Sequence, residues 1–393
     1  MREINVALIG EGFMGRTHSN AWTQVTKFFK PSIRPVMHTS CGRREEHLKV
    51  FSKNWGWLRA SANWENTVRS AEIDLVDVVT PNFLHAKIAT AAIEAGKHVA
   101  CEKPIAATLA EAREMVQAAR HAHVETFVWF NYRRCPAVAL AHKLVKDGAI
   151  GTIRHVRAFY LQDWADESIP LVWRFQKERA GSGAHGDLNA HIVDMTRFVT
   201  GEEITEICGA VAETFIKERK KMVGTAAGGI AAGVQSGEDK GPVTVDDTLL
   251  FLARFSGGAV ASFEAARQAT GNQNRNGFEL NGTKGSLKFD FERMNELQYY
   301  DATRPRAVQG WTSIMCTHGG DHPYAEHWWP DAHTLGYEHG FINQAYDILQ
   351  VLAGLEPTVP IPDFNDAYQT QRVLEAALIA AAERRPVALG EVD

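Results

Sequence analysis

Short apolar runs rich in β-branched residues alternate with longer segments of helical period over the first third of the chain. The runs predict strands at Ile4 to Ile9, Pro35 to Cys41, Asp74 to Val79, His98 to Cys101 and Thr126 to Trp129. The segments between them predict helices at Met14 to Phe28, Glu45 to about Lys53, Ala86 to Glu94 and Leu109 to His121. Continuous apolar strands separated by helices are typical of a parallel sheet covered on both faces. Residues 1–130 are therefore predicted to form a doubly wound α/β domain.

The pattern changes after a predicted helix at Ala137 to Lys146. Alternating apolar and polar positions predict strands at Arg154 to Leu161, Ile204 to Ile216, Thr248 to Phe255, Ala259 to Ala265, Phe278 to Asn281 and Ser286 to Phe291. Turn signals such as Ser256-Gly257-Gly258 join several of them. We expect residues 131–393 to form an α+β domain with a large, open antiparallel sheet.

Three further segments of this second region are not predicted to be strands. Helical spacing at Glu338 to Ala353 and Asp366 to Arg384 predicts two more helices, and we expect the helix near 366–384 to pack back toward the N-terminal domain. The stretch Lys220 to Gly241 is rich in Gly, Ala and Ser, which predicts a surface loop or insertion.

Composition and charge narrow the class of protein. The 393 residues are 45% apolar and 23% charged, with a net charge of −5. A mildly acidic chain without a Lys/Arg-rich run argues against nonspecific binding to nucleic acid or anionic membrane. The five cysteines are odd in number and never form Cys-x-x-Cys, and the first apolar run is too short for a signal peptide. We therefore expect a cytoplasmic protein with neither a disulfide framework nor a membrane span.

A glycine motif follows the first predicted strand and opens the first predicted helix. In Gly10-Glu11-Gly12-Phe13-Met14-Gly15, the first glycine permits a tight turn, the second lets the backbone approach a pyrophosphate, and the third allows close helix packing. The helix N-terminus then offers free N–H groups to phosphates. The motif predicts a bound dinucleotide.

The end of the second predicted strand bears on which dinucleotide is bound. An NAD site usually has an acid here for the ribose 2′-hydroxyl, but the sequence reads Ser40-Cys41-Gly42-Arg43-Arg44. The two arginines can pair with a 2′-phosphate, or they can simply solvate the start of a helix. NAD and NADP both remain open.

Two tripeptides follow strands at the edge of the sheet where ligands bind. Thr80-Pro81-Asn82 comes after the strand ending at Val79, and Glu102-Lys103-Pro104 after the strand ending at Cys101. Pro104 restricts Lys103 to an extended backbone, which can project its ammonium group toward the cofactor. A lone Lys-Pro pair is otherwise usually a surface lysine.

A fourth motif combines an acid and two histidines. If Asp187 lies in a first helical turn, His191 follows on the same face, as an oriented general base requires. An exposed ion pair is the alternative. With His185, the motif also resembles a metal site of two histidines and a carboxylate, but His185 would lie on another face of the helix, so we expect no metal.

Several of the ten tryptophans lie beside polar residues, as in a sugar site, although core packing is their commoner role.

These motifs together resemble a known family. Gly10-x-Gly12-x-x-Gly15, Thr80-Pro81-Asn82 with His85, Glu102-Lys103-Pro104, Asn131-Tyr132-Arg133 and Asp187-x-x-x-His191 are similar to the glucose-fructose oxidoreductase/inositol dehydrogenase (Gfo/Idh/MocA) family. Pro362-Asp363-Phe364 and the following helix resemble its C-terminal segment. Asn131 to Arg134, Tyr160 to Trp164, Trp173 to Phe175 and Gly336 to Glu338 look most like the levoglucosan dehydrogenases and glycoside 3-dehydrogenases.

The resemblance implies a fold and a set of site residues. It implies a Rossmann domain and an open sheet through which homodimers or homotetramers assemble, and it makes Lys103, Asp187 and His191 the catalytic residues. The expected cofactor-binding residues are Gly10, Gly12, Phe13, Met14, Gly15, Gly42, Arg43, Thr80, Pro81, Asn82, His85, Glu102, Lys103 and Asn131. The expected substrate-binding residues are Lys103, Tyr132, Arg133, Asp163, Trp164, Trp173, Arg174, Asp187, His191 and His339. Asn189 and His185 depart from the family pattern, so the substrate is in doubt.

Two functions follow from the resemblance. One is an NAD- or NADP-dependent dehydrogenase that oxidises a secondary hydroxyl of a sugar, glycoside or cyclitol to a ketone, with C3 of a pyranose as one candidate position. The other is a catalytically silent dinucleotide-binding sensor. Retention of Lys103, Asp187 and His191 favours the enzyme, although either Lys103 or His191 can be the proton acceptor.

Overall fold

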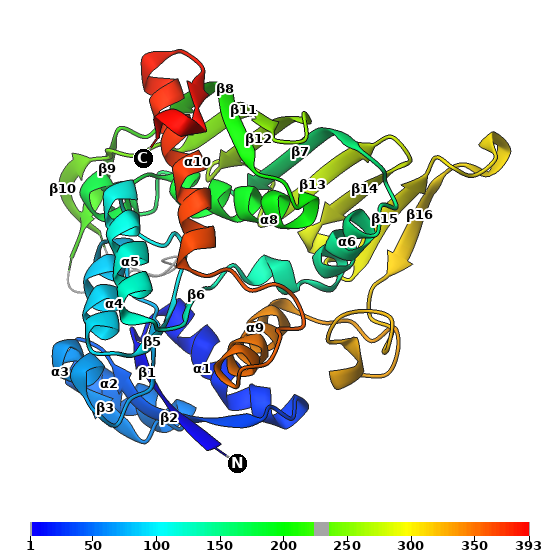
Figure 1. Cartoon of the computed structure of the whole chain (residues 1–393). Helices are drawn as coiled ribbons and strands as arrows, with labels where there is room; N and C mark the ends of the chain where they lie inside the picture. The colour runs from blue at the N-terminus through cyan, green and yellow to red at the C-terminus, as the bar shows by residue number, and fades with distance from the viewer. Residues whose placement is uncertain (1, 224–235, 393) are drawn as a thin grey trace. The chain divides into compact units, whose positions relative to one another are not determined.

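The computed structural model describes residues 2–223 and 236–392, which form two compact units (Figure 1). Unit 1 contains residues 2–131 and Gly336–Tyr368, and unit 2 contains residues 132–223, 236–335 and 369–392. The helix α10 (Phe364–Glu383) contributes its first residues to unit 1 and the rest to unit 2. No helix within these described residues is both long and apolar enough to cross a membrane.

Unit 1 is built on a six-stranded parallel sheet in the order β3-β2-β1-β4-β5-β6. The strands are β1 (Arg2–Ile9), β2 (Ile33–Cys41), β3 (Arg59–Ser61), β4 (Leu75–Val78), β5 (His98–Cys101) and β6 (Thr126–Val128). The helices are α1 (Phe13–Phe28), α2 (Glu45–Trp55), α3 (Trp64–Arg69), α4 (His85–Glu94), α5 (Leu109–Ala122) and α9 (Tyr337–Leu352). The strand order reverses between β1 and β4, so this sheet edge is the expected ligand crevice of a doubly wound fold. The predicted Rossmann architecture is confirmed.

Unit 2 contains a nine-stranded sheet in the order β16-β15-β14-β13-β7-β12-β11-β8-β17 (Figure 1). Its strands are β7 (Ile153–Leu161), β8 (Ile204–Glu213), β11 (Thr248–Phe255), β12 (Val260–Ala266), β13 (Arg275–Gly282), β14 (Gly285–Asp290), β15 (Glu296–Asp301), β16 (Trp311–Met315) and β17 (Val387–Ala388). Neighbouring strands are antiparallel except β7 and β12, which run parallel. The predicted large antiparallel sheet is confirmed in this mixed form.

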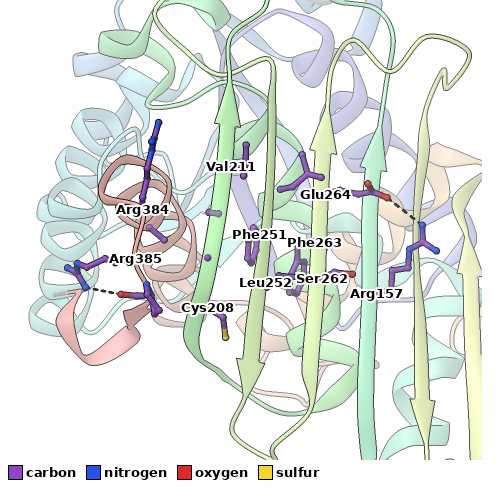
Figure 2. Close-up of a pocket in the computed structure, with 15 residues that line it drawn as sticks. Arg157, Cys208, Val211, Phe251, Leu252, Ser262, Phe263, Glu264, Arg384 and Arg385 are labelled. Carbon is purple, nitrogen blue, oxygen red and sulfur yellow. Dashed lines mark hydrogen bonds and ion pairs between the residues drawn. The ribbon is translucent and has the colours of Figure 1, made fainter.

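The two faces of the nine-stranded sheet differ in what covers them. The helices α6 (Pro136–Lys146) and α8 (Ala190–Thr200) pack on one face, and every residue of α8 is buried. The other face exposes Val211, Leu250, Leu252 and Val260. Figure 2 shows a hollow on it, where Arg157 and Glu264 lie across neighbouring strands.

The Gly-rich stretch predicted as a loop is partly a hairpin. β9 (Glu218–Met222) pairs antiparallel with β10 (Ser236–Pro242), while residues 224–235 lie outside the described part of the chain. The loop prediction is therefore wrong at both ends of Lys220 to Gly241. Arg219 provides the physical reason, because its buried guanidinium donates to the carbonyls of Ala165 and Ile169 and stacks on the Phe175 ring at 3.9 Å.

Candidate functional site

The glycine loop of unit 1 has the geometry that a dinucleotide requires. Gly10 has φ +126°, and a Cβ there would lie 2.7 Å from the carbonyl oxygen of Val79. A Cβ on Gly15 would lie 2.6 Å from the carbonyl oxygen of Gly10, whereas one on Gly12 would meet nothing within 4 Å. The α1 N-terminus has no side-chain cap and no acid in its first turn. The loop therefore leaves open space and free N–H groups where phosphates bind.

Two aromatic residues lie next to this loop. Phe13 is 40% exposed, and its ring stacks on Tyr337 of α9 at 6.4 Å between centroids, with Met14 half-buried beside it in the chain. The sequence reasoning included Phe13 and Met14 but missed Tyr337, which is distant in sequence. Such a partly exposed pair offers a flat apolar surface to a ligand ring.

The loops after β4 and β5 are joined by a buried histidine. The His85 imidazole lies 2.8 Å from the Thr80 carbonyl and 2.9 Å from the Pro104 carbonyl, and burial lowers its pKa. His85 was expected to bind cofactor, but both ring nitrogens face these backbone carbonyls. Its role in the structure is to hold the loop of Thr80, Pro81 and Asn82 against that of Pro104.

Beneath Lys103 lies a buried charge cluster that the sequence did not reveal. His18 Nδ1 is 3.0 Å from both carboxylate oxygens of Asp77, and its Nε2 is 3.0 Å from Glu102 Oε1. The other Glu102 oxygen accepts the backbone N–H of Lys103 at 3.1 Å. Burial lowers the pKa of His18, but the two carboxylates outweigh this and raise it to about 9. His18 is therefore an imidazolium at neutral pH, and Glu102 faces it instead of the cofactor-binding edge.

Three other expected residues of unit 1 have defined surroundings. Asn131 is buried, and its carbonyl oxygen packs close to the Cα of Gly340 in α9. His339 Nδ1 accepts the N–H of Gly336 at 3.0 Å, so it caps α9, and burial lowers its pKa. Arg43 is exposed at the start of α2.

In unit 2, a π-helical turn (η4, His185–Asn189) leads into α8. The carboxylate of Asp246 accepts the N–H groups of Gly183 at 2.7 Å and His185 at 2.8 Å, which fixes the start of this turn. π-Helical turns are frequent at functional sites. The predicted single regular helix over Asp187 and His191 is thus interrupted, with Asp187 in the turn and His191 in α8.

Asp187 lies between two arginines. Its carboxylate oxygens are 3.6 Å from Arg174 Nη1 and 3.8 Å from Arg267 Nη1. Arg174 stacks on Trp173 at 4.4 Å, and the buried Arg267 lies over Trp164 at 5.6 Å. The tryptophans expected near a substrate therefore support these cations. Arg267 was missed because it directly follows β12, far from Asp187 along the chain.

His191 lies against two tyrosines that begin a chain of hydrogen bonds. Its ring centroid is 4.6 Å from that of Tyr132 and 5.7 Å from that of Tyr160. The two tyrosine hydroxyls are 2.8 Å apart, and Tyr160 donates to Asn274 Oδ1 at 2.8 Å. Burial raises the pKa of Tyr160, so it stays a neutral donor.

The chain of hydrogen bonds continues away from His191. Gln162 donates to the same Asn274 oxygen at 2.8 Å and accepts the indole N–H of Trp164 at 2.8 Å. Asp163, which was expected here, instead accepts the N–H of Gly271 at 3.1 Å. Tyr160, Gln162 and Asn274 were missed as site residues.

The two departures from the family pattern pair with each other. His185 Nε2 donates to the Leu374 carbonyl at 2.8 Å, and its Nδ1 accepts from Asn189 Nδ2 at 2.9 Å. Burial lowers the pKa of His185, which agrees with this neutral form. His185 therefore belongs to helix packing and does not converge with Asp187 and His191. Across residues 2–223 and 236–392, no group of three or more His, Cys, Asp or Glu side chains is arranged to hold a metal.

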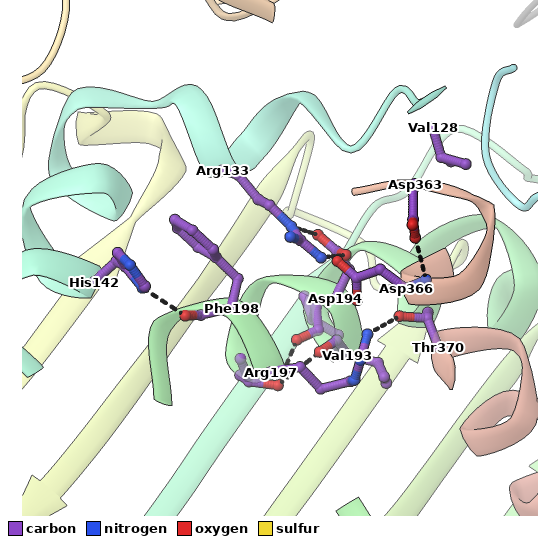
Figure 3. A network of polar contacts seen from close by, with 12 residues as sticks. Val128, Arg133, His142, Val193, Asp194, Arg197, Phe198, Asp363, Asp366 and Thr370 are labelled. Atoms are coloured by element: carbon purple, nitrogen blue, oxygen red, sulfur yellow. Dashed lines mark hydrogen bonds and ion pairs between the residues drawn. The ribbon is translucent and has the colours of Figure 1, made fainter. Parts of the chain in front are cut away.

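Arg133 differs from its expected role in substrate binding. Figure 3 shows its guanidinium against Asp194 of α8, with one hydrogen bond of 2.9 Å and a second contact between Nη2 and Oδ1. Both side chains are buried, and Arg133 also lies over the Phe198 ring at 5.2 Å. A buried, paired guanidinium is structural because separating it from Asp194 would leave a charge without water.

Comparison with known proteins agrees with this geometry. Residues 4–130 match the model of the oxidoreductase family with an NAD-binding Rossmann fold, and residues 138–288 match the GFO/IDH/MocA C-terminal domain. The chain is 41% identical to the levoglucosan dehydrogenase of Pseudarthrobacter phenanthrenivorans over the full length of both proteins. It is 35% identical to the 1,5-anhydro-D-fructose reductase of Ensifer adhaerens over 62% of this chain and 64% of the relative.

Solved structures give the same result. An oxidoreductase domain protein from Kribbella flavida superposes with a TM-score of 0.91 at 46% identity, over 99% of this chain and 100% of the other. Levoglucosan dehydrogenase in complex with NADH and L-sorbose has a TM-score of 0.91 at 39% identity, over 99% of each chain. The open glycine loop, the uncapped α1 and these full-length similarities together identify the chain as an NAD-dependent oxidoreductase of the Gfo/Idh/MocA family of sugar dehydrogenases.

Proposed function

We propose that this enzyme oxidises a secondary ring hydroxyl of a neutral sugar, glycoside or cyclitol to a ketone, with C3 of a pyranose as one candidate position, and that the same site catalyses the reverse reduction. The observation that carries the proposal is the hydrogen-bonded chain from Tyr132 to Trp164 beside His191. Relatives named for levoglucosan, 1,5-anhydro-D-fructose and myo-inositol support the substrate class.

The direction of the hydrogen bonds supports a substrate rich in hydroxyl groups. Tyr160 uses its proton on Asn274, so the hydrogen bond between the tyrosines requires Tyr132 to donate to Tyr160. A phenol oxygen that donates in this way can also accept a hydrogen bond, as a sugar hydroxyl would supply. Aromatic rings beside such acceptors suit the apolar face and polar edge of a pyranose.

The arrangement of charges supports a neutral substrate over a sugar acid. Arg133 is paired with Asp194, and Arg174 and Arg267 both face Asp187. These contacts pair the positive charges of the arginines with carboxylates of the protein. A carboxylated or phosphorylated substrate would have to compete with these buried or half-buried pairs.

The proposed mechanism assigns a role to each of three side chains. Bound NAD+ supplies a hydride acceptor at C4 of its nicotinamide ring. His191 accepts the proton of the reacting hydroxyl, and the Lys103 ammonium stabilises the negative charge that develops on that oxygen. Asp187, which faces Arg174 and Arg267, accepts a hydrogen bond that orients the substrate or the His191 ring.

The test is an assay of purified protein with NAD+, NADP+ and a panel of sugars, glycosides, cyclitols and sugar acids, following absorbance of the reduced cofactor. Lys103→Ala and His191→Ala should each lower kcat by roughly two to four powers of ten while NADH binding is kept. His121→Ala, at an exposed position of α5, serves as the control. Activity only with carboxylated or phosphorylated substrates would overturn the neutral-sugar proposal.

We extend the proposal to assembly as a homodimer or homotetramer through the open face of the sheet. Val211, Leu250 and Leu252 expose apolar surface there, and Arg157 and Glu264 add charges of both signs. A surface that combines apolar residues with both charges can pair with its own copy across a two-fold axis.

A further inference from the structure

The acid that the sequence lacks after β2 is supplied by the glycine loop. A Cβ built on Gly42 would lie 2.7 Å from Glu11 Cδ and 2.9 Å from Glu11 Oε2, so the Glu11 carboxylate lies directly against Gly42. The loop is held there because the N–H of Gly10 donates to the Cys41 carbonyl at 2.8 Å. A carboxylate therefore lies at the C-terminal end of β2, although no residue of Ser40 to Arg44 is acidic.

The position of this carboxylate is fixed from a third element. Glu11 Oε2 is 3.0 Å from Nδ1 of His47 in α2, and the Glu11 side chain is only 10% exposed. Glycine at position 42 is required for this arrangement because any larger side chain would displace the carboxylate. The loop after β1, the end of β2 and α2 thus meet around this carboxylate.

We propose that Glu11 is the ribose-binding acid of this enzyme and makes it selective for NAD over NADP. This inference rests on the proposed function only in assuming a bound nicotinamide dinucleotide. In Rossmann sites, an acid at the end of the second strand accepts hydrogen bonds from the adenosine ribose. The same negative charge repels a 2′-phosphate, and the repulsion is strong because Glu11 is largely shielded from water.

The nearby arginines do not reverse this preference. Arg43 and Arg44 are exposed, so solvent and salt screen their attraction for a phosphate. Two further acids, Glu45 and Glu46, follow them in the first turn of α2. The charged side chains near a 2′-phosphate would therefore be of both signs. Among them, Glu11 is the one that is largely shielded from water.

The experiment measures binding, not turnover. Dissociation constants for NADH and NADPH, and for AMP and 2′-phospho-AMP, are determined by calorimetry for the wild type, Glu11→Gln and the control Glu114→Gln, an exposed acid on α5. The wild type should bind NADH at least about tenfold more tightly than NADPH, and Glu11→Gln should reduce this ratio at least about tenfold. His47→Gln, which frees the Glu11 side chain, should give an intermediate ratio, and Glu114→Gln should match the wild type.

Equal affinity of the wild type for NADH and NADPH would overturn the inference. A Glu11→Gln protein that keeps the wild-type circular dichroism and an unchanged ratio of NADPH to NADH dissociation constants would also overturn it. The same holds if Arg43→Ala selectively weakens NADPH binding while Glu11→Gln has no effect. In these cases sugar-dependent activity would still be present, so the proposed function would stand. Tight dinucleotide binding with no oxidation of any sugar would instead refute the proposed function and leave the role of Glu11 intact.

Discussion

The buried His18 cluster makes the stability of unit 1 depend on pH in a predictable direction. His18 contacts Asp77 and Glu102, and its pKa is raised from 6.5 to about 9. The substitution His18→Gln keeps a polar side chain of similar size but removes the positive charge. Asp77 and Glu102 would then be buried without a cation, which is strongly destabilising.

The magnitude follows from the raised pKa of His18. The rise from 6.5 to about 9, at ~1.4 kcal/mol per pH unit, corresponds to about 3 kcal/mol of folding free energy. Between these two pH values the folded protein retains a proton that the unfolded chain has lost. This stabilisation is therefore fully present below pH 6.5, decreases as pH rises, and is absent above about pH 9.

Urea unfolding followed by tryptophan fluorescence provides the assay. Trp22 and Trp129 both donate to Asp77, at 2.8 and 3.0 Å, so their emission reports on the cluster itself. The wild type should lose about 3 kcal/mol between pH 6.5 and 9 relative to His18→Gln, with the exposed His121→Gln as control. Parallel loss of stability in the wild type and His18→Gln would show that His18 is neutral in the folded protein.

Three further predictions concern the loop, the substrate and the open face. Gly12→Val should fold normally, since a Cβ there meets nothing within 4 Å, but it should lose NADH binding as measured by calorimetry. Gly10→Val should instead unfold at a lower temperature than the wild type in a thermal melt. Tyr132→Phe should raise KM for the best sugar by about tenfold, with NADH affinity unchanged by fluorescence titration. Leu252→Lys should shift the sedimentation coefficient to that of a monomer without changing the far-ultraviolet circular dichroism, and an unchanged oligomer would refute assembly through this face.

The sequence predicted those parts of the fold that depend on local pattern. The strand at His98 to Cys101 was predicted residue for residue, and the helix at Leu109 to Ala122 to within one residue, because burial and capping leave periodic signals. The three-residue strand β3 and the six-residue helix α3 were missed because they are too short to show a period. The hairpin of β9 and β10 was missed because buried Arg219, not an apolar pattern, anchors it.

The candidate site likewise has features that local sequence predicts and contacts that it does not. The glycine loop was predictable because its spacing and its strand-to-helix context lie within a few residues. Glu11 against Gly42, and Arg267 against Asp187, are contacts between residues far apart in the chain, and no local pattern indicates them. The same limit explains Arg133, which the family resemblance made a substrate-binding residue, whereas its partner Asp194 lies on a distant helix.

Both units place a buried ion cluster directly beside a proposed catalytic side chain. In unit 1, His18 is paired with Asp77 and contacts Glu102, which in turn accepts the N–H of Lys103. In unit 2, Arg267 lies beside Asp187. Buried ion clusters cost desolvation energy and are often less stabilising than apolar residues of the same volume. Protonation of His18 stabilises its own cluster, but apolar residues at the same positions would stabilise the fold as well or better. The presence of these clusters beside Lys103 and Asp187 is therefore better explained by fixing the orientation of these two residues.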